Sequence, residues 1–402
     1  MKTDRAVHWG LGIGAILIAA ALWWPGLFLK KTGKGVGATV PQKWEFTAGG
    51  AVTGALALGS DGTLYAASED GFVYALYPSG EVEWRFETDR AVVGPTIGAD
   101  GTIFVTNTEE HIFAINRAGG QLWTSHGGPY IGKQMGSTAP AIDRNYLYAP
   151  WHGPLVAMQV ADGTLIWGAG RFFQEGGSVS VLPSGLIVYP GDGRINALDS
   201  TGRPQWQYPA VNAASAGMNA NPFARNIRLD SGIAAGYDGT IYTCVVDSRL
   251  DAIGPDGTLK WEFKTKISSV NKGTPVIATD GTIYFGTDGG TFYAINADGT
   301  QKWTVETGSA IAATPILAED ETIYVVNGLA VFAVSPDGKV IAKTPVDGGV
   351  DSSPTLAPDG TIYVASNRGK IIALAGTHGG LMNSSWPKFQ ADLSNSGRAH
   401  TY

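Results

Sequence analysis

A repeating aromatic position constrains the fold of this chain more than any other feature of its sequence. It recurs eight times, at intervals of 39 to 53 residues, as Tyr65, Phe104, Tyr148, Tyr189, Tyr242, Tyr284, Tyr324 and Tyr363. A regular period of this length is typical of proteins built by repeating one supersecondary unit. The sequence therefore predicts eight copies of a unit of about 40 residues.

The unit is clearest in Asp280–Trp303. Three Asp-Gly turns, at Asp280, Asp288 and Asp298, separate the segments TIYFGT and TFYAIN, whose β-branched and aromatic residues are typical of strands. A short apolar segment, often opened by Pro, precedes the aromatic, and a Trp opens the last strand. Four short strands per unit predict an all-β, eight-bladed β-propeller. The Asp-Gly pairs lack the further ligands of a calcium loop, so we expect them to form turns.

The spacing of Ala and Trp in each unit supports a family assignment. The spacing of Ala, Asn, Gly and Trp in Ala294–Trp303 resembles the tryptophan-docking motif Ala–x–Asp/Asn–x₃–Gly–x₃–Trp of pyrroloquinoline-quinone (PQQ)-like propeller repeats. Most copies in this chain are one residue shorter than that motif, and Ala157–Trp167 has its full spacing. The resemblance extends from Trp44 to about Arg398. It implies that each Trp docks against the neighbouring blade, so that the Trp side chains form a girdle between blades. Blade seven departs from the motif, because Ala342 stands where Trp is expected.

Both ends of the repeat region carry extra segments. Trp44-Glu45-Phe46 repeats the pattern of Trp84-Arg85-Phe86, yet no blade precedes it. We expect this strand to complete blade eight, which removes an exposed sheet edge. Ser385–Arg398 breaks the repeat and resembles the Trp-Pro-x-Phe terminal segment of PQQ-like propellers. We expect a structural strap over the ring closure; a partner-binding tail is the alternative.

The N-terminal segment is apolar. Residues 6–29 contain no Asp, Glu, Lys or Arg. A helix of this length extends about 36 Å, enough to cross a hydrocarbon core of about 30 Å, and Trp23-Trp24 suits a membrane interface. The sequence predicts a short tail at 1–5, a transmembrane anchor at 6–29 and a flexible linker at 30–43. A cleaved secretory signal is the alternative.

Flanking charges do not fix the orientation of this segment. Lys2 and Arg5 precede it, and Lys30, Lys31 and Lys34 follow it. Taken literally, the positive-inside rule slightly favours a cytoplasmic propeller, but large domains translocate despite such a bias and N-terminal apolar segments commonly direct export. We expect the propeller (44–384) and the C-terminal strap (385–402) to lie outside the cytoplasm, in the periplasm or at the cell surface.

The chemical inventory favours binding over catalysis. The net charge of −7, without a Lys/Arg run in the repeats, argues against a nucleic-acid partner. No His lies in a paired metal spacing, and no nucleophile-elbow motif is present. The single cysteine, Cys244, excludes an internal disulfide, and its strand position indicates a packed core residue. PQQ dehydrogenases typically carry an adjacent-Cys disulfide, calcium ligands and a catalytic Asp, none of which we can match here. We expect no catalytic residue, metal or cofactor.

Long connections indicate a candidate binding rim. The length of each connection is counted from the Trp in the last strand of one unit to the first strand of the next unit. Regular connections measure 11 to 14 residues, whereas the connection from Trp123 to Pro140 measures 17 and that from Trp206 to Ile233 measures 27. In a four-stranded meander, the connections between blades lie on the same face as the loops that join the second and third strands of each blade. We therefore expect these long connections and loops to form one rim over blades three to five. Aromatics, Met and Arg are enriched at interface cores. The candidate partner-binding residues are Tyr130, Trp151, His152, Arg171, Phe172, Phe173, Met218, Phe223, Arg225 and Arg228.

These residues have a second interpretation, in which they only fold the loops onto the ring.

The favoured function is a non-enzymatic, membrane-anchored propeller that binds protein or peptide as a scaffold at the cell envelope. In fold it resembles the outer-membrane-assembly propeller lipoproteins, but no Cys near its N-terminus could carry the lipid. The alternative is a quinoprotein-like enzyme, or a propeller that binds a small ligand or carbohydrate in its central channel.

Overall fold

The computed structural model describes residues 38–399 except 53, 90–91, 108–110, 126–139, 151–154, 170–176, 192, 211–230, 246–247, 267–272 and 377–378. Contacts divide the chain into Met1–Lys34 and Gly35–Tyr402, and the described residues all belong to the second unit. The anchor predicted at 6–29 and the tail at 1–5 lie outside them. Within the described part, no helix is long and apolar enough to cross a membrane.

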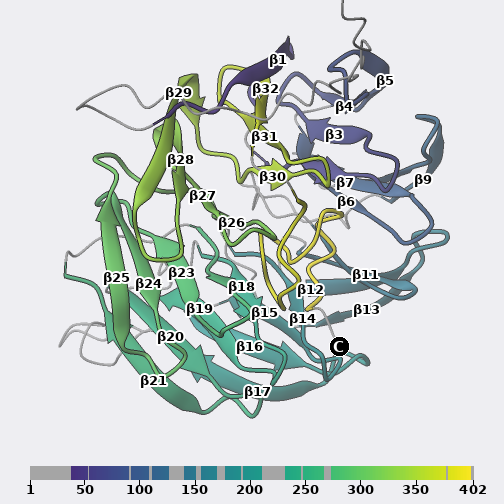
Figure 1. Ribbon diagram of the computed structural model, residues 1–402. Coiled ribbons are helices and arrows are strands. Elements are labelled where there is room, and N and C mark those ends of the chain that lie inside the picture. Colours follow the sequence, from purple (N-terminus) through teal and green to yellow (C-terminus); the bar gives the residue numbers. More distant parts are fainter. Residues whose placement is uncertain are drawn as a thin grey trace, which may run out of the picture. The chain divides into compact units, whose positions relative to one another are not determined.

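In the described part of the chain, thirty-two strands form eight four-stranded antiparallel sheets (Figure 1). The first four blades are β2 (Ala57–Leu58), β3 (Leu64–Ala67), β4 (Phe72–Leu76) and β5 (Val82–Glu87); β6 (Val92–Ile97), β7 (Ile103–Asn107), β8 (Ile112–Ile115) and β9 (Gln121–Ser125); β10 (Ala141–Asp143), β11 (Tyr146–Pro150), β12 (Leu155–Gln159) and β13 (Leu165–Ala169); and β14 (Ser180–Val181), β15 (Ile187–Gly191), β16 (Arg194–Leu198) and β17 (Pro204–Pro209).

The remaining blades continue the same order along the chain. They are β18 (Ile233–Ala235), β19 (Ile241–Val245), β20 (Arg249–Ile253) and β21 (Leu259–Lys264); β22 (Val276–Ile277), β23 (Ile283–Gly286), β24 (Thr291–Ile295) and β25 (Gln301–Glu306); β26 (Ile316–Leu317), β27 (Ile323–Val326), β28 (Gly328–Val334) and β29 (Val340–Val350); and β30 (Thr355–Leu356), β31 (Thr361–Ala365) and β32 (Lys370–Ala375) with β1 (Gln42–Thr47). The predicted eight-bladed propeller is confirmed.

Strand register explains why an aromatic, an Ala and a Trp recur together. In blade six, Tyr284 pairs with Ala294, which pairs with Trp303 on its other side. Directly opposed residues share one face of a sheet. The small Ala therefore leaves room for the two rings to meet above it, with centroids 5.6 Å apart. One three-residue row thus fixes the register of three strands.

The Trp side chains link neighbouring blades, as the family resemblance implied. In the described part of the chain, seven indole Nε1 atoms donate hydrogen bonds of 2.8–3.0 Å to carbonyls in the outer turn of the next blade. The pairs are Trp44 to Pro78, Trp84 to Arg117, Trp123 to Val160, Trp167 to Ser200, Trp206 to Pro255, Trp261 to Ala297 and Trp303 to Pro336. We call this ring of contacts the Trp girdle.

The N-terminal strand closes the ring. β1 pairs antiparallel with β32, with Trp44 opposite Ala373, and becomes the outer strand of blade eight. This confirms the expected closure. Because β1 comes from the other end of the chain, no turn joins β32 to the outer strand of blade eight. In the other blades, a carbonyl of this turn accepts the hydrogen bond from the Trp of the preceding blade. The absence of a Trp at position 342 of blade seven therefore has a structural reason.

Residues 38–41 link blades seven and eight where that Trp is missing. Ala38 forms a parallel bridge with Ala342 of β29, and the Val40 N–H donates to Thr344 Oγ1 at 2.7 Å. The Ala375 N–H of β32 donates to the Pro41 carbonyl at 2.7 Å. The sequence analysis placed these residues in a flexible linker at 30–43. The structure places them against two blades, and we call them the N-terminal latch.

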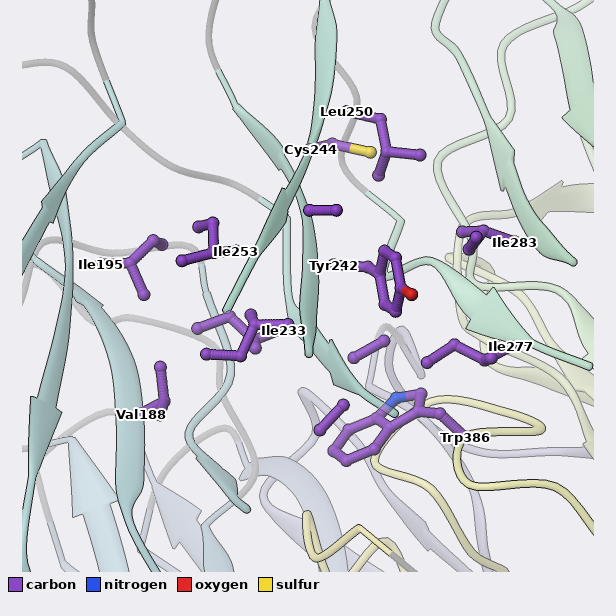
Figure 2. Close-up of a cluster of buried hydrophobic side chains, with 14 of the residues drawn as sticks. Val188, Ile195, Ile233, Tyr242, Cys244, Leu250, Ile253, Ile277, Ile283 and Trp386 are labelled. Carbon is purple, nitrogen blue, oxygen red and sulfur yellow. The ribbon is translucent and has the colours of Figure 1, made fainter. Parts of the chain in front are cut away.

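The hydrophobic core lies between adjacent sheets. Its largest cluster includes Tyr242 of β19, Ile277 of β22 and Trp386 of the C-terminal segment. Figure 2 shows the Trp386 indole next to Tyr242 and the Cys244 sulfur beside Leu250. Cys244 is buried, as expected for a packed core residue.

Candidate functional site

The predicted binding rim lies outside the described residues. None of its ten residues, Tyr130, Trp151, His152, Arg171, Phe172, Phe173, Met218, Phe223, Arg225 and Arg228, is placed. The structure describes the strands that flank two of the connections: β13 ends at Ala169 and β14 begins at Ser180, while β17 ends at Pro209 and β18 begins at Ile233. These connections therefore enter their blades at the start of the first strand. The rim stays a prediction.

First strands of neighbouring blades contact one another, so they line the centre of the ring, here called the axis. Ser and Thr hydroxyls connect them. Thr96 Oγ1 donates to the Pro140 carbonyl at 2.8 Å, and Ser180 Oγ donates to the Ile233 carbonyl at 2.8 Å. Similar bonds join Ser231 to Gly273, Thr274 to Thr314 and Thr314 to Ser353. An inner ring of hydroxyl contacts thus complements the outer Trp girdle.

Sequence reasoning missed this inner ring, although a signal was present. A hydroxyl residue adjoins the Pro that opens several first strands, as in Thr274-Pro275, Thr314-Pro315 and Ser353-Pro354. The prolines were interpreted as strand starts. Hydroxyls beside them were not interpreted as contacts between blades.

The strap crosses the axis. Its carbonyls accept hydrogen bonds of 2.7–2.9 Å from N–H groups on the first strands of six blades: Leu393 from Leu58, Ser394 from Ile97, Ser396 from Ile142, Gly397 from Val181, Trp386 from Ile277 and Pro387 from Leu317. Figure 1 shows this C-terminal segment, in yellow, across the middle of the ring. The strap therefore reaches far beyond the ring closure at which the sequence analysis placed it. Most of its residues are buried, which disfavours a free partner-binding tail.

The strap and the blade connections lie at opposite ends of the first strands. Leu58, Ile97 and Val181 are the last residues of β2, β6 and β14, and they bond to the strap. The connections enter at the first residues of such strands. Trp386 and Lys388 of the strap are fully buried.

Lys388 is the buried charge-bearing group of the strap. Its Nζ donates to the Phe389 carbonyl at 3.1 Å, to the Asp392 carbonyl at 2.9 Å and to Asn395 Oδ1. Asn395 Nδ2 donates in turn to the carbonyls of Leu56 and Pro95, in blades one and two. Burial lowers the pKa of Lys388 to about 7, against an opposing effect of the Asp392 charge.

Blade five contains a buried ion pair that sequence reasoning also missed. Arg249 and Asp251 lie two residues apart on β20 and are 2% and 0% exposed. Arg249 Nε lies 2.6 Å from Asp251 Oδ1, and its Nη1 lies 3.3 Å from Glu262 Oε2. Tyr208 of blade four donates its hydroxyl to Asp251 at 2.7 Å. Burial raises the pKa of Asp251, while bonds from Arg249 and Tyr208 lower it.

The signal for this pair was a break in the repeat. Asp251 stands at the position that Tyr74, Phe113, Tyr293 and Phe332 occupy in other blades. Both charged residues are enclosed within the fold. Their arrangement joins blades four and five, and it offers no exposed nucleophile or acid.

The Asp-Gly pairs form turns, as predicted. Asp280 Oδ1 accepts from the Thr282 N–H at 2.9 Å, and Lys302 Nζ lies 3.0 Å from Asp280 Oδ2. Partial burial raises the pKa of Asp280, but the bonds from Thr282 and Lys302 bring it below its usual value. Among the described residues, no three His, Cys, Asp or Glu side chains are grouped so that they could hold a metal.

Eight four-stranded blades, the Trp girdle and closure by the N-terminal strand define a PQQ-type β-propeller. The family model of the outer membrane protein assembly factor BamB matches residues 37–182 and 191–386. The chain therefore belongs to the BamB family. No curated protein sequence matches it.

Solved structures show the same architecture at low sequence identity. BamB from Moraxella catarrhalis superposes with a TM-score of 0.70 at 16% identity, over 84% of this chain and 100% of that one. The computationally designed Ika8 protein gives a TM-score of 0.67 at 11% identity, over 82% and 97%. A europium-containing methanol dehydrogenase gives 0.66 at 14% identity, over 81% and 84%. At such identities the likeness concerns the fold alone.

Proposed function

We propose that this chain is a non-enzymatic propeller that binds a protein or peptide partner as a scaffold at the cell envelope. The proposal includes the N-terminal segment 6–29 as a membrane tether and a position of the propeller outside the cytoplasm. The observation that carries it is the BamB family match, which covers residues 37–182 and 191–386. By name, that family assembles outer membrane proteins, a task that requires protein partners.

The strap supports a site on the opposite rim. Because its carbonyls accept hydrogen bonds from the first strands of six blades, five of them at the last residue of the strand, the strap end of the axis is occupied by the chain itself. The longest blade connections enter from the other end. Inserted loops on a rigid scaffold commonly carry function. The partner surface proposed here is therefore the rim of blades three to five.

The test is affinity isolation from membranes with the full-length chain. Replacing Phe172, Phe173 and Arg225 together with Ala should lower the affinity for the partner roughly thirtyfold and so reduce its recovery. The reason is that central aromatic and Arg anchors typically contribute about 2 kcal/mol or more. The melting temperature should stay close to that of the wild type. Tyr284→Ala is the control, because it removes a buried blade-six aromatic and should lower stability. A triple variant that melts early and binds normally would contradict the proposal.

A quinoprotein-like function is the second candidate, because a methanol dehydrogenase shares the fold. It predicts that the purified protein acquires a quinone absorbance band when PQQ and calcium are added, and that it oxidises alcohols in a dye-linked assay. The scaffold proposal predicts neither. A bound chromophore with turnover would overturn it.

A further inference from the structure

The N-terminal part of the described chain enters the propeller on the side that carries the strap. First strands end there, as Leu58 and Ile97 do where they bond the strap, and we call this side the strap face. Strands alternate in direction within each antiparallel blade, so third strands also end, and fourth strands begin, at the strap face. β1 is the fourth strand of blade eight, and the N-terminal latch before it contacts blades seven and eight. The chain therefore enters at the strap face, between these two blades.

The predicted rim lies at the opposite corner of the propeller. Fourth strands end away from the strap face, so the connections that follow β13 and β17 leave from the other face. In a ring of eight blades, blade three lies opposite blade seven and blade four lies opposite blade eight. Figure 1 shows β13 across the ring from β29. The rim over blades three to five is thus separated from the entry point both through the thickness of the propeller and across its ring.

The chain before the latch is short. Leu29, the last residue of the predicted anchor, and Ala38, the first described residue, are nine positions apart. An extended chain advances at most about 3.6 Å per residue, so about 32 Å is the longest distance that can separate these two residues. Residues 38–41 are bonded to both β29 and β32, so this restraint acts on the propeller itself. The entry point is therefore held close to any membrane that the anchor crosses.

The outer turns of the strap face carry ionised carboxylates. Asp256 and Asp298 lie in the turns that lead into β21 and β25. Hydrogen bonds from Thr258 and Thr300 hold the pKa of Asp256 and the pKa of Asp298 below their usual values, so both side chains are charged at neutral pH. Anionic lipid surfaces attract basic segments and not acidic ones. We therefore expect the propeller to stand off the bilayer, held through the latch alone.

We propose that the rim over blades three to five stands on the side of the propeller farthest from the membrane, so that it meets a water-exposed surface of its partner and not a membrane-embedded one. This inference rests on the proposed function, because it takes residues 6–29 as the tether and the rim as the partner surface. One corner of the propeller is tied to the membrane, and the opposite corner is presented to the partner.

Fluorescence quenching by spin-labelled lipid headgroups tests this orientation on the full-length protein in liposomes. Ile341 of β29 and Ile166 of β13 form a matched pair, because each is 44% exposed and directly precedes the residue that pairs with the alanine of its blade. Fluorophore-labelled Ile341→Cys should lose most of its emission, and Ile166→Cys should lose less. Gln207→Cys, which is exposed near the rim end of β17, should lose none. Wild-type protein, whose Cys244 is buried, gives the background labelling.

A second label on the entry side covers the case in which Ile341→Cys fails to fold. Gln42 is exposed at the start of β1, and labelled Gln42→Cys should be quenched as strongly as Ile341→Cys. Quenching at Gln207 equal to or stronger than that at the entry-side labels would overturn the orientation. A chain that does not float with liposomes would refute the tether, and the orientation with it.

The kind of partner is tested by mapping a photocrosslink from Phe172. The captured peptide should come from a water-exposed segment of the envelope protein. A crosslink to a membrane-spanning segment of that protein would overturn the proposal. If Phe172 captured no protein while the quenching pattern held, the scaffold function would be wrong and the orientation of the propeller would still stand.

Discussion

At the residue scale, the glycine against which each Trp ring packs meets two separate requirements, one on backbone conformation and one on packing. Gly299 has φ +87°, and a Cβ there would lie 2.8 Å from the Trp261 ring. Gly308 in the same blade has φ +82° with nothing within 4 Å of the corresponding Cβ. The two positions therefore share a backbone requirement, and Gly299 alone adds a packing requirement.

Alanine substitution should separate these requirements. Gly308→Ala should lower the free energy of unfolding by about 1–2 kcal/mol, the cost of a left-handed residue with a Cβ. Gly299→Ala should cost a further 1–3 kcal/mol or so, because it displaces the docked indole. Urea denaturation measures both. Equal losses in the two variants would show that the Trp girdle tolerates the extra methyl group.

The Arg249–Asp251 pair gives a second test at this scale. Arg249→Met should destabilise the fold by about 3–5 kcal/mol, because it leaves the fully buried Asp251 without its cation. Lys264→Met is the matched control: Lys264 Nζ pairs with the same Glu262 at 3.4 Å, but its side chain is 68% exposed. A surface pair of this kind contributes about 0–1 kcal/mol. If both variants lose equally little stability in urea denaturation, the buried pair has no special structural role.

At the element scale, the N-terminal latch should stabilise the boundary between blades seven and eight. Deleting residues 1–36 should leave the melting temperature unchanged. Deleting 1–41 should cost about 2–4 kcal/mol, because it removes the buried Val40, exposes the buried Ala342 and removes hydrogen bonds to two blades. Deleting 1–48 also removes β1 and should prevent stable folding. Identical melting curves for the 1–36 and 1–41 deletions would contradict this role.

Sequence periodicity predicted the blades because each blade repeats one local row. Tyr284, Ala294 and Trp303 are close in sequence and also adjacent across their sheet, so the pattern and the contact coincide. The latch and the strap have no such repeat. Their partners, such as Ala342 for Ala38 and Leu58 for Leu393, lie hundreds of residues away and make backbone contacts that leave no residue pattern.

At the scale of the whole molecule, location is the first prediction to check. A reporter active only outside the cytoplasm, fused after Tyr402, should be active. The protein should also stay in the membrane pellet after a high-salt wash, since residues 6–29 carry no Asp, Glu, Lys or Arg and a hydrophobic anchor resists salt. A soluble product beginning near Leu22 would instead identify a cleaved signal.

The candidate site was less predictable than the fold for a physical reason. Loop length and composition identify where a rim departs from the repeat, as the 27-residue interval from Trp206 to Ile233 does. They do not determine which side chains of such a loop face a partner and which fold onto the blades. Asp251 illustrates the point, since its break in the repeat pattern corresponds to a buried pair with Arg249.

Site-specific photocrosslinking in intact cells tests the scaffold function most directly. A photoreactive residue at Phe172 or Arg225 should crosslink one and the same envelope protein. The same residue at Asn383, which is exposed just before the C-terminal strap, serves as the control and should not capture that protein. If the envelope protein were crosslinked from Asn383 and from neither rim position, the result would contradict the account.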